Sequence, residues 1–208
     1  MCIRDRVNLL ARLYPVERGC ICIDGRELND ITLESLRGLL GFVPQEAFLF
    51  SDTIGHNIAF AHPDAFENVV REAADLASID QEISEFPDGF ETLLGERGIN
   101  LSGGQKQRTA LARAFHKDPK VLILDDALAS VDTRTEDRIL ENIRKFARER
   151  TLIIIAHRIS TVRHADHILV FRNGAIIEEG DHESLIRAGG LYADLFEQQR
   201  LKSEIEVM

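Results

Sequence analysis

VLILDD, residues 121–126, places four apolar residues directly before two aspartates. A continuous apolar run of this length is typical of a central strand of a parallel sheet, whose two faces are both covered. A second such run, TLIIIA at 151–156, follows after a segment with helical spacing. Strands that alternate with helices predict an α/β fold with a mostly parallel central sheet. Because ligands of such sheets bind at the carboxyl ends of the strands, Asp125, Asp126 and His157 are candidates for a functional site.

Asp125 and Asp126 permit two interpretations at this end of the strand. They are either ordinary solvated or helix-capping acids, or the acids of a phosphoryl-transfer site. In the second interpretation Asp125 holds Mg²⁺ through water while Asp126 orients an attacking water. The stretch by itself leaves both interpretations open.

LSGGQ, residues 101–105, stands at the start of a segment with helical periodicity that runs from about Gly103 to Phe115. Two glycines at a helix start leave backbone N–H groups accessible at its positive end, and Ser102 adds a hydroxyl donor. This arrangement predicts an anion-binding site. A flexible helix N-cap is the alternative that the same residues allow.

The rest of the chain continues the alternation of helices and short strands. Thr32 is expected to cap the helix TLESLRG, and Asp64 to cap an amphipathic helix. Asn173-Gly174 predicts the turn of a hairpin. The expected helices are 7–13, 32–38, 64–78, 133–148, 182–188 and 191–204, and the expected further strands are 20–23, 39–43, 167–171 and 175–180.

The composition of the 208 residues limits the classes of protein. Hydrophobic residues make up 44% and charged residues 29%, which favours a globular chain over a disordered one. The net charge of −10 argues against nucleic acid as the main partner. No stretch approaches the roughly 20 apolar residues of a membrane-spanning helix. We therefore expect a domain that lies in the cytoplasm.

Cys20 and Cys22 stand two residues apart in GCICIDG, so their side chains are expected on one face of a short strand. A metal-binding pair is conceivable, but no second cluster of ligands accompanies it. We expect half-buried strand residues in a reducing compartment.

Five motifs now stand in a definite order. They are Gln45 after the strand LLGFVP, LSGGQ at 101–105, VLILDD at 121–126, ASVD at 129–132 and AHR at 156–158. In that order and spacing they resemble the nucleotide-binding domain of ABC transporters, and the resemblance covers Val7 to about Gln199. It implies a P-loop NTPase (RecA-like) core, an α-helical subdomain inserted at about residues 52–115, and ATP and Mg²⁺ as cofactors.

The resemblance implies a role for each matched residue. Gln45 is similar to the Q-loop glutamine, which contacts the Mg²⁺ and attacking-water region and couples it to the membrane domains. Asp125 matches the Walker B aspartate, a metal ligand, and Asp126 stands at the position of the catalytic carboxylate. His157 matches the switch histidine, which bonds the γ-phosphate of ATP.

Ser102, Gly103, Gly104 and Gln105 resemble the signature motif, which binds the γ-phosphate of an ATP held by the opposite subunit. Asp132 resembles the D-loop aspartate, which communicates across that dimer. The implied partner is therefore a second ABC ATPase domain.

Two further segments resemble those of exporters rather than importers. GERG at 95–98 is similar to the exporter x-loop, and GLYADLFEQQ at 190–199 is similar to exporter C-termini. The resemblance implies a transmembrane domain upstream on the same polypeptide in the intact gene. It also implies a place at the cytoplasmic face of a membrane, as part of a transporter whose membrane helices choose the substrate.

MCIRDR, residues 1–6, departs from the family pattern. In the family a helix like VNLLARLY follows directly on the Walker A loop, G-x-x-G-x-G-K-[ST], so its lysine would fall at about Ile3 and its hydroxyls at the next two positions. We expect foreign sequence joined to a partial ATPase domain, 7–208, that lacks the N-terminal part of its core and does not bind ATP tightly by itself. The alternative is an evolved N-terminus in which Arg4 and Arg6 replace the phosphate-binding loop.

Asp126 is the second departure, because the family carries glutamate there. One methylene fewer sets the carboxylate back by about one bond length, out of reach of the water that a general base must contact. Asp126 together with an intact LSGGQ resembles the degenerate subunit of heterodimeric exporters. The signature of such a subunit completes the partner's site while its own site turns over poorly. The alternative is that Asp126 acts as the base after a small shift of its loop.

Two other functions compete with this one. An ABC-type ATPase of DNA maintenance would interrupt the domain with long coiled coils, whereas only about 55 residues separate Gln45 from LSGGQ and they show no sustained heptads. The other is a folded, non-catalytic remnant that acts only through dimerisation or its signature motif. Binding of labelled ATP to the chain would distinguish this remnant from an ATPase.

Overall fold

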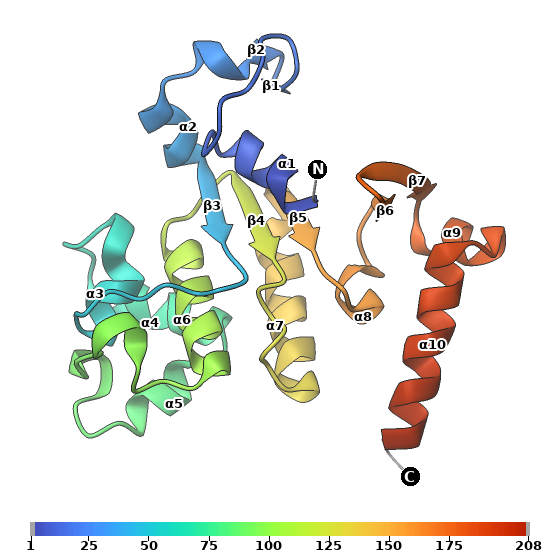
Figure 1. Cartoon of the computed structure of the whole chain (residues 1–208). Coiled ribbons are helices and arrows are strands. Elements are labelled where there is room, and N and C mark those ends of the chain that lie inside the picture. Colours follow the sequence, from blue (N-terminus) through green and yellow to red (C-terminus); the bar gives the residue numbers. More distant parts are fainter. Residues whose placement is uncertain (1–2, 207–208) are drawn as a thin grey trace. The chain divides into compact units, whose positions relative to one another are not determined.

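The computed structural model describes residues 3–206 (Figure 1). The chain divides into two units, a larger one of residues 16–154 and a smaller one of the described parts of 1–15 and 155–208. Each unit has a hydrophobic cluster of its own, and each is described by itself.

A three-stranded sheet in the order β3-β4-β5 organises the larger unit. β3 (Leu40–Val43) and β4 (Val121–Asp125) are parallel, with Leu40 opposite Val121 and Val43 opposite Leu124. The apolar residues 122–124 of β4 are at most 2% exposed, as the sequence predicts for a covered strand. β5 (Thr151–Ile155) is only half-buried over residues 152–154, whereas β3, at the other end of this order, is mostly buried.

Helices pack on this sheet through apolar faces. α7 (Thr133–Phe146) buries Ile139 and Ile143, which belong to the same cluster as the β4 leucines. α6 (Gly103–His116) buries most of its length, with Leu111 fully covered. Both helices begin at the residues that the sequence predicts.

A group of helices lies between β3 and β4 in the chain (Figure 1). Its members are α3 (Ile54–Ile58), α4 (Glu67–Leu76), α5 (Asp80–Ser84) and α6, joined by the 3₁₀ turns Ala59–Ala61, Gly89–Glu91 and Glu96–Gly98. α3 and α4 pack against α6, so the group shares one interior. These helices span residues 54–116, the region in which the insertion is expected at about 52–115, and the bounds of the insertion stay a prediction.

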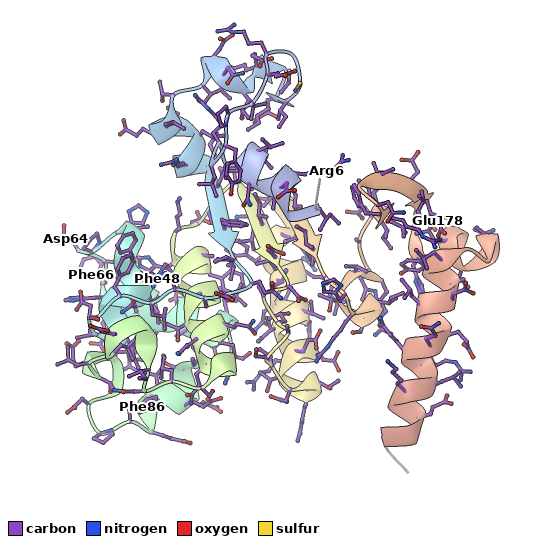
Figure 2. The ribbon with its side chains drawn as sticks, viewed as in Figure 1. Arg6, Phe48, Asp64, Phe66, Phe86 and Glu178 are labelled. Carbon is purple, nitrogen blue, oxygen red and sulfur yellow. The ribbon has the colours of Figure 1, made fainter. Side chains whose placement is uncertain are left out.

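The predicted cap of α4 at Asp64 is wrong. The helix begins at Glu67, and Phe66 is its N-cap residue, without a side-chain hydrogen bond (Figure 2). Asp64 lies in a turn that is closed by the Ala65 amide donating to the His62 carbonyl at 3.1 Å. Because the turn that contains Pro63 extends to Ala65, the backbone becomes helical only after Asp64.

The N-terminal part of the larger unit carries a small hairpin and a helix. β1 (Cys22–Ile23) and β2 (Arg26–Glu27) pair antiparallel, and after the 3₁₀ turn Leu28–Asp30 comes α2 (Leu33–Leu39). Thr32 caps α2 as predicted, since its hydroxyl accepts from the Ser35 amide at 3.2 Å. Cys20 and Cys22 are exposed rather than half-buried, because two-residue strands form no face that could be covered.

The smaller unit combines a hairpin with four helices among its described residues. β6 (Ile168–Arg172) and β7 (Ala175–Gly180) pair around the predicted Asn173-Gly174 turn, in which both residues have positive φ. The helices are α1 (Ile3–Leu10), α8 (Ile159–Val162), α9 (His182–Ala188) and α10 (Leu191–Glu206). Ile159, Ile168, Leu185 and Tyr192 form the interior.

The start of α1 differs from the sequence prediction, because the helix begins at Ile3 instead of Val7. Arg6 belongs to it and donates to the Gly174 carbonyl at 2.9 Å, with its guanidinium 4.8 Å from the centre of the Phe171 ring (Figure 2). Residues 3–6 therefore continue the helix. Met1 and Cys2 lie outside the described residues, and the foreign origin of 1–6 stays a prediction.

Within residues 3–206, no helix has the length and apolar character that crossing a membrane requires.

Candidate functional site

The carboxyl ends of β3 and β4 bring two of the candidate residues together. Gln45 follows β3 after Pro44, and Asp126 directly follows β4. The two strands are parallel neighbours, so these residues leave the sheet at the same edge. The Gln45 side chain reaches across, and its Nε2 donates to Asp126 Oδ2 at 3.3 Å.

The two aspartates after β4 lie in different environments. Asp125 is 4% exposed, whereas Asp126 is half-buried. Asp126 has a φ of +49°, in the left-handed region that aspartate enters more readily than most residues. This turn of the backbone ends the strand and leaves the Asp126 carboxylate within hydrogen-bonding distance of Gln45.

Carboxylate and amide oxygens at this edge match the ligand preference of Mg²⁺. Among residues 3–206, no group of three or more His, Cys, Asp or Glu residues could enclose a metal. Mg²⁺ does not require such a group, because it usually keeps several waters and takes one or two carboxylates together with substrate phosphates. Asp125, Asp126 and the Gln45 amide therefore fit a Mg²⁺–nucleotide complex in the chemistry of their donors.

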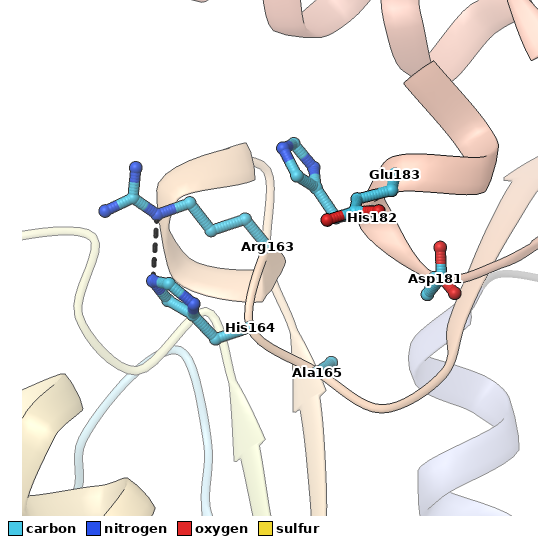
Figure 3. Close-up of a pocket in the computed structure, with 6 residues that line it drawn as sticks. All are labelled: Arg163, His164, Ala165, Asp181, His182 and Glu183. Carbon is cyan, nitrogen blue, oxygen red and sulfur yellow. Dashed lines mark hydrogen bonds between the residues drawn. The ribbon is translucent and has the colours of Figure 1, made fainter. Parts of the chain in front are cut away.

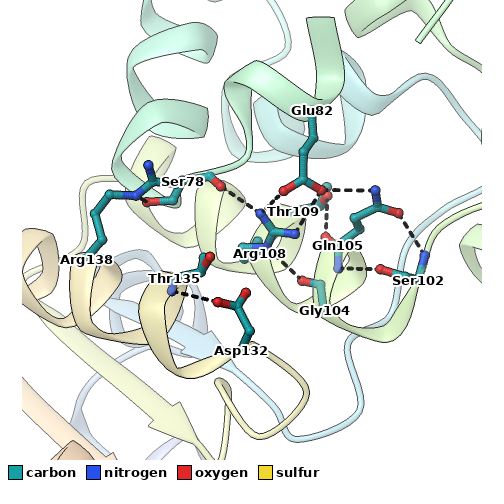
Figure 4. Close-up of polar contacts among 10 residues, drawn as sticks. All are labelled: Ser78, Glu82, Ser102, Gly104, Gln105, Arg108, Thr109, Asp132, Thr135 and Arg138. Carbon is teal, nitrogen blue, oxygen red and sulfur yellow. Dashed lines mark hydrogen bonds and ion pairs between the residues drawn. The ribbon is translucent and has the colours of Figure 1, made fainter. Parts of the chain in front are cut away.

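The segment LSGGQ forms the start of α6 through a capping box (Figure 4). Ser102 Oγ accepts from the Gln105 amide at 3.2 Å, and the Ser102 amide donates to Gln105 Oε1 at 2.9 Å. Ser102 is thus the N-cap residue of α6, as the N-cap interpretation predicts. This cap is compatible with the anion-site interpretation, because Gly103 and Gly104 hold the first two amides of the helix, which point out of its positive end.

Gly104 allows this helix start to lie against the loop after β4, whereas Gly103 is not needed for the approach. A Cβ on Gly104 would stand 2.8 Å from the backbone oxygen of Ser130, closer than side chains approach. A Cβ on Gly103 would meet the Ser130 side chain at 3.5 Å, an ordinary contact. Gly104 is therefore required by close backbone packing in addition to any role toward an anion.

Gln107 joins three of these segments, and the sequence analysis missed it. Its side chain is 5% exposed on the buried face of α6. Nε2 donates to the Gln45 carbonyl at 3.3 Å, and Oε1 accepts from the Ser130 amide at 2.9 Å. A polar residue at a core-facing position of the helix was the signal available in the sequence.

A second missed group fixes the start of α6 to α5 (Figure 4). Arg108, 7% exposed, donates from Nη1 to Glu82 Oε1 at 2.5 Å and from Nη2 to Oε2 at 2.9 Å. Gln105 Nε2 donates to the same carboxylate at 3.1 Å. The hydrogen bonds from Arg108, and in smaller part from Gln105, hold the pKa of Glu82 below its ordinary value.

Asp132 is the N-cap of α7, and its Oδ1 accepts from the Thr135 amide at 3.0 Å (Figure 4). This backbone hydrogen bond is the main reason that the pKa of Asp132 lies below its ordinary value. The residue is exposed, so its carboxylate stays ionised at the protein surface.

His157 belongs to the smaller unit, in the segment between β5 and α8. The residue is exposed, and its carbonyl accepts from Gln199 Nε2 of α10 at 2.8 Å. Gln199 is a third residue that the sequence analysis missed, because its partner lies 42 residues away in the chain.

A family model for the ABC transporter matches residues 6–129, more than half of the chain. The chain belongs to the ABC transporter family.

Relatives of this ABC transporter chain include ATP-binding cassette proteins of several organisms. It is 47% identical over 196 residues to ABC transporter B family member 6 of Dictyostelium discoideum, covering 94% of this chain and 29% of that protein. It is 46% identical over 198 residues to ATP-binding cassette sub-family B member 6 of Mus musculus, covering 95% of this chain and 24% of that protein. The chain thus spans about a quarter of the length of these curated relatives.

A solved structure, that of a bacterial Atm1-family ABC exporter with ATP bound, superposes on the ABC transporter chain with a TM-score of 0.91. The two are 45% identical, and the match covers 95% of this chain and 35% of the exporter chain. This likeness confirms the expected fold class, a P-loop NTPase α/β core with an inserted helical subdomain.

A pocket of about 480 Å³ in the smaller unit of this ABC transporter chain is lined by Arg163, His164, Ala165, Asp181, His182 and Glu183 (Figure 3). Arg163 Nε donates to His164 Nε2 at 3.1 Å within it. None of the residues that the sequence analysis proposed for the site lines this pocket.

Proposed function

We propose that this chain is the nucleotide-binding domain of an ABC exporter subunit and couples Mg-ATP binding and hydrolysis to export across a membrane. The observation that carries the proposal is the contact between Gln45 and Asp126. It joins the loop after β3 to the acid after β4, where an attacking water and its base must meet. Gln107 extends the connection to the backbone beside the signature segment.

The proposal gives each candidate residue a task. Asp125 would hold the metal, and Asp126 would accept the proton of the attacking water only slowly, because its carboxylate is one methylene shorter than the glutamate of the family. Gln45 orients Asp126 and that water through its amide. Mg²⁺, when bound with ATP, neutralises the phosphate charge. His157 donates a hydrogen bond to the γ-phosphate.

The signature segment acts, in the proposal, on the nucleotide of a second ABC ATPase domain. The first amides of α6 and the Ser102 hydroxyl supply donors to that γ-phosphate, and Asp132 contacts the partner domain. Since Asp126 is one methylene shorter than glutamate, we propose that the partner is a different chain with the longer acid. Transmembrane domains complete the transporter and place this domain at the cytoplasmic face.

The test is the ATPase rate of the reconstituted heterodimer with single changes in this chain. Ser102→Arg is expected to abolish most activity, because it blocks the partner's site, whereas Asp126→Glu is expected to raise the rate. Ser35→Arg, on exposed α2, is the matched control. Full activity of the Ser102 variant would show that the signature segment does not serve the partner's nucleotide.

One observation favours a second candidate for these 208 residues as they stand. The printed sequence contains no G-x-x-G-x-G-K-[ST] segment, whose amides and lysine cradle phosphates in P-loop proteins. The candidate is a folded domain that acts through dimerisation or its signature motif without holding nucleotide itself. Equilibrium binding of labelled ATP to the 208-residue chain distinguishes the two, since tight binding excludes the second candidate.

A further inference from the structure

The side-chain amide of Gln199, on α10, brackets the backbone on both sides of Arg158. Its Nε2 donates to the His157 carbonyl at 2.8 Å, and its Oε1 accepts from the Ile159 amide at 2.8 Å. We infer that Gln199 is a positioning residue for His157. Its two hydrogen bonds, to the His157 carbonyl and from the Ile159 amide, fix the main chain at His157, and together they are called the amide clamp. This inference rests on the proposed role of His157 toward the γ-phosphate.

The start of α8 explains why this segment needs a partner from elsewhere. Ile159 is the first residue of the helix, so its amide has no acceptor within the helix. Arg158 is the N-cap residue and makes no side-chain cap hydrogen bond. Gln199 supplies the missing acceptor to this first amide of the helix, which an N-cap side chain does not bond, because N-cap side chains accept from the second or third amide.

α10 is itself held at its beginning, which makes it a firm support. Glu178, on β7, accepts from the Leu191 amide at 2.6 Å and from the Tyr192 amide at 3.1 Å (Figure 2). A carboxylate at a helix N-terminus stabilises the helix through its dipole. Tyr192 is 3% exposed, and its hydroxyl lies 2.9 Å from His182 Nδ1. Gln199 follows about two turns later on the same helix.

The side chain and the backbone of His157 therefore have different surroundings. The residue is exposed, which suits a side chain that must reach a phosphate, while its backbone carbonyl is held by the half-buried Gln199 of α10. A shift of about 1 Å in a group that contacts the reacting atoms costs on the order of a hundredfold in rate. Loss of the amide clamp would therefore lower turnover without removing any group that touches ATP.

Hydrogen exchange of the Ile159 amide tests the clamp in the 208-residue chain. Gln199→Leu is expected to speed this exchange by about tenfold, because the amide loses its acceptor. Gln199→Glu keeps an acceptor for the Ile159 amide but repels the His157 carbonyl, so it is expected to retain part of the protection. Gln198→Leu, the same change on the exposed neighbour, is the matched control and should leave exchange unchanged. Equal protection in the Gln199→Leu and Gln198→Leu chains would overturn the inference.

ATP turnover of the intact exporter subunit in its dimer tests the functional part. Gln199→Leu is expected to lower kcat by about ten- to a hundredfold with little change in KM for ATP. Gln199→Glu is expected to lower kcat as well, because its carboxylate keeps the bond to the Ile159 amide but repels the His157 carbonyl. His157→Ala serves as the reference. If His157→Ala loses activity and Gln199→Leu does not, the inference fails while the proposed function stands. If His157→Ala keeps full activity, the proposed role of His157 fails, and the exchange experiment still decides whether the clamp exists.

Discussion

Removing the guanidinium of Arg108 is expected to weaken the whole helical group, because this buried cation joins α6 to α5. Arg108 makes two hydrogen bonds to the Glu82 carboxylate, one to the Ser78 carbonyl at 2.7 Å and one to the Gly104 carbonyl at 3.3 Å. Arg108→Met keeps the apolar stem of the side chain and deletes all four. The change therefore isolates the polar part of the contact.

The expected loss follows from the surroundings of each partner. Breaking a buried ion pair by removing one member costs about 3–5 kcal/mol, because the other charge stays uncompensated. The Glu82 side chain is 39% exposed, so water can replace part of what it loses, and screening weakens the pair. We therefore expect Arg108→Met to lower the free energy of unfolding by about 3 kcal/mol. Glu82→Gln keeps the shape and should cost about 1 kcal/mol.

Urea denaturation of the 208-residue chain measures these losses, and the double variant gives the coupling, expected at about 1–2 kcal/mol. Lys145→Met, at an exposed pair with Glu141, is the control and should change stability by less than about 0.5 kcal/mol. Because the pKa of Glu82 is depressed in the folded state, its contribution exists above about pH 4.3 and is lost as the pH falls through the folded pKa. A loss for Arg108→Met no larger than for Lys145→Met would refute the reasoning.

Three further changes test packing and burial by the same urea titration. Gly104→Ala should lower stability by about 1–3 kcal/mol, because its Cβ would meet the Ser130 backbone oxygen at 2.8 Å; wild-type stability would contradict this. Gly38→Ala, in α2 with nothing within 4 Å of the added Cβ, should instead raise stability by up to about 1 kcal/mol, and any loss there would count against the open space. His116 is 7% exposed, neither of its ring nitrogens has a hydrogen-bond partner among the described residues, and burial, with a smaller contribution from His62, lowers its pKa. Its folded state resists protonation, so stability should fall as the pH drops below about 6.5, and His116→Leu should remove that part of the fall; an identical pH profile would argue against it.

The sequence predicts the main elements because their causes are local. A continuous apolar run such as that of β4 specifies a covered strand, and Thr32 caps α2 with an amide three residues away. The apolar run and the helix cap can each be recognised from a few neighbouring residues. Asp64 fails under the same rules, because a proline turn and a helix cap compete for the same residues and the turn takes precedence.

In the candidate site too, the residues placed by local signals are predictable from the sequence, and the residues placed by helix packing are not. Gln45 and Asp126 follow strands, so their meeting at one sheet edge is accessible to sequence reasoning once the strands are parallel neighbours. Arg108 and Gln199 are not accessible in this way. Arg108 bonds the Glu82 carboxylate 26 residues away, and the partners of Gln199 lie 40 and 42 residues away. These partners are chosen by how whole helices pack, which no local pattern encodes.

The side-chain amide of Gln107 ties the backbones of two loops to each other. Its nitrogen donates to the carbonyl of Gln45 in one loop, and its oxygen accepts from the amide of Ser130 in the other. A glutamate here would keep the second bond and turn the first into repulsion, because a carboxylate cannot donate. Both partners are main-chain groups, so the side chains of either loop are free to change, but the backbone of neither loop can shift independently of the other. Position 107 therefore acts as a shared constraint on the main-chain paths of two segments that lie far apart in the chain.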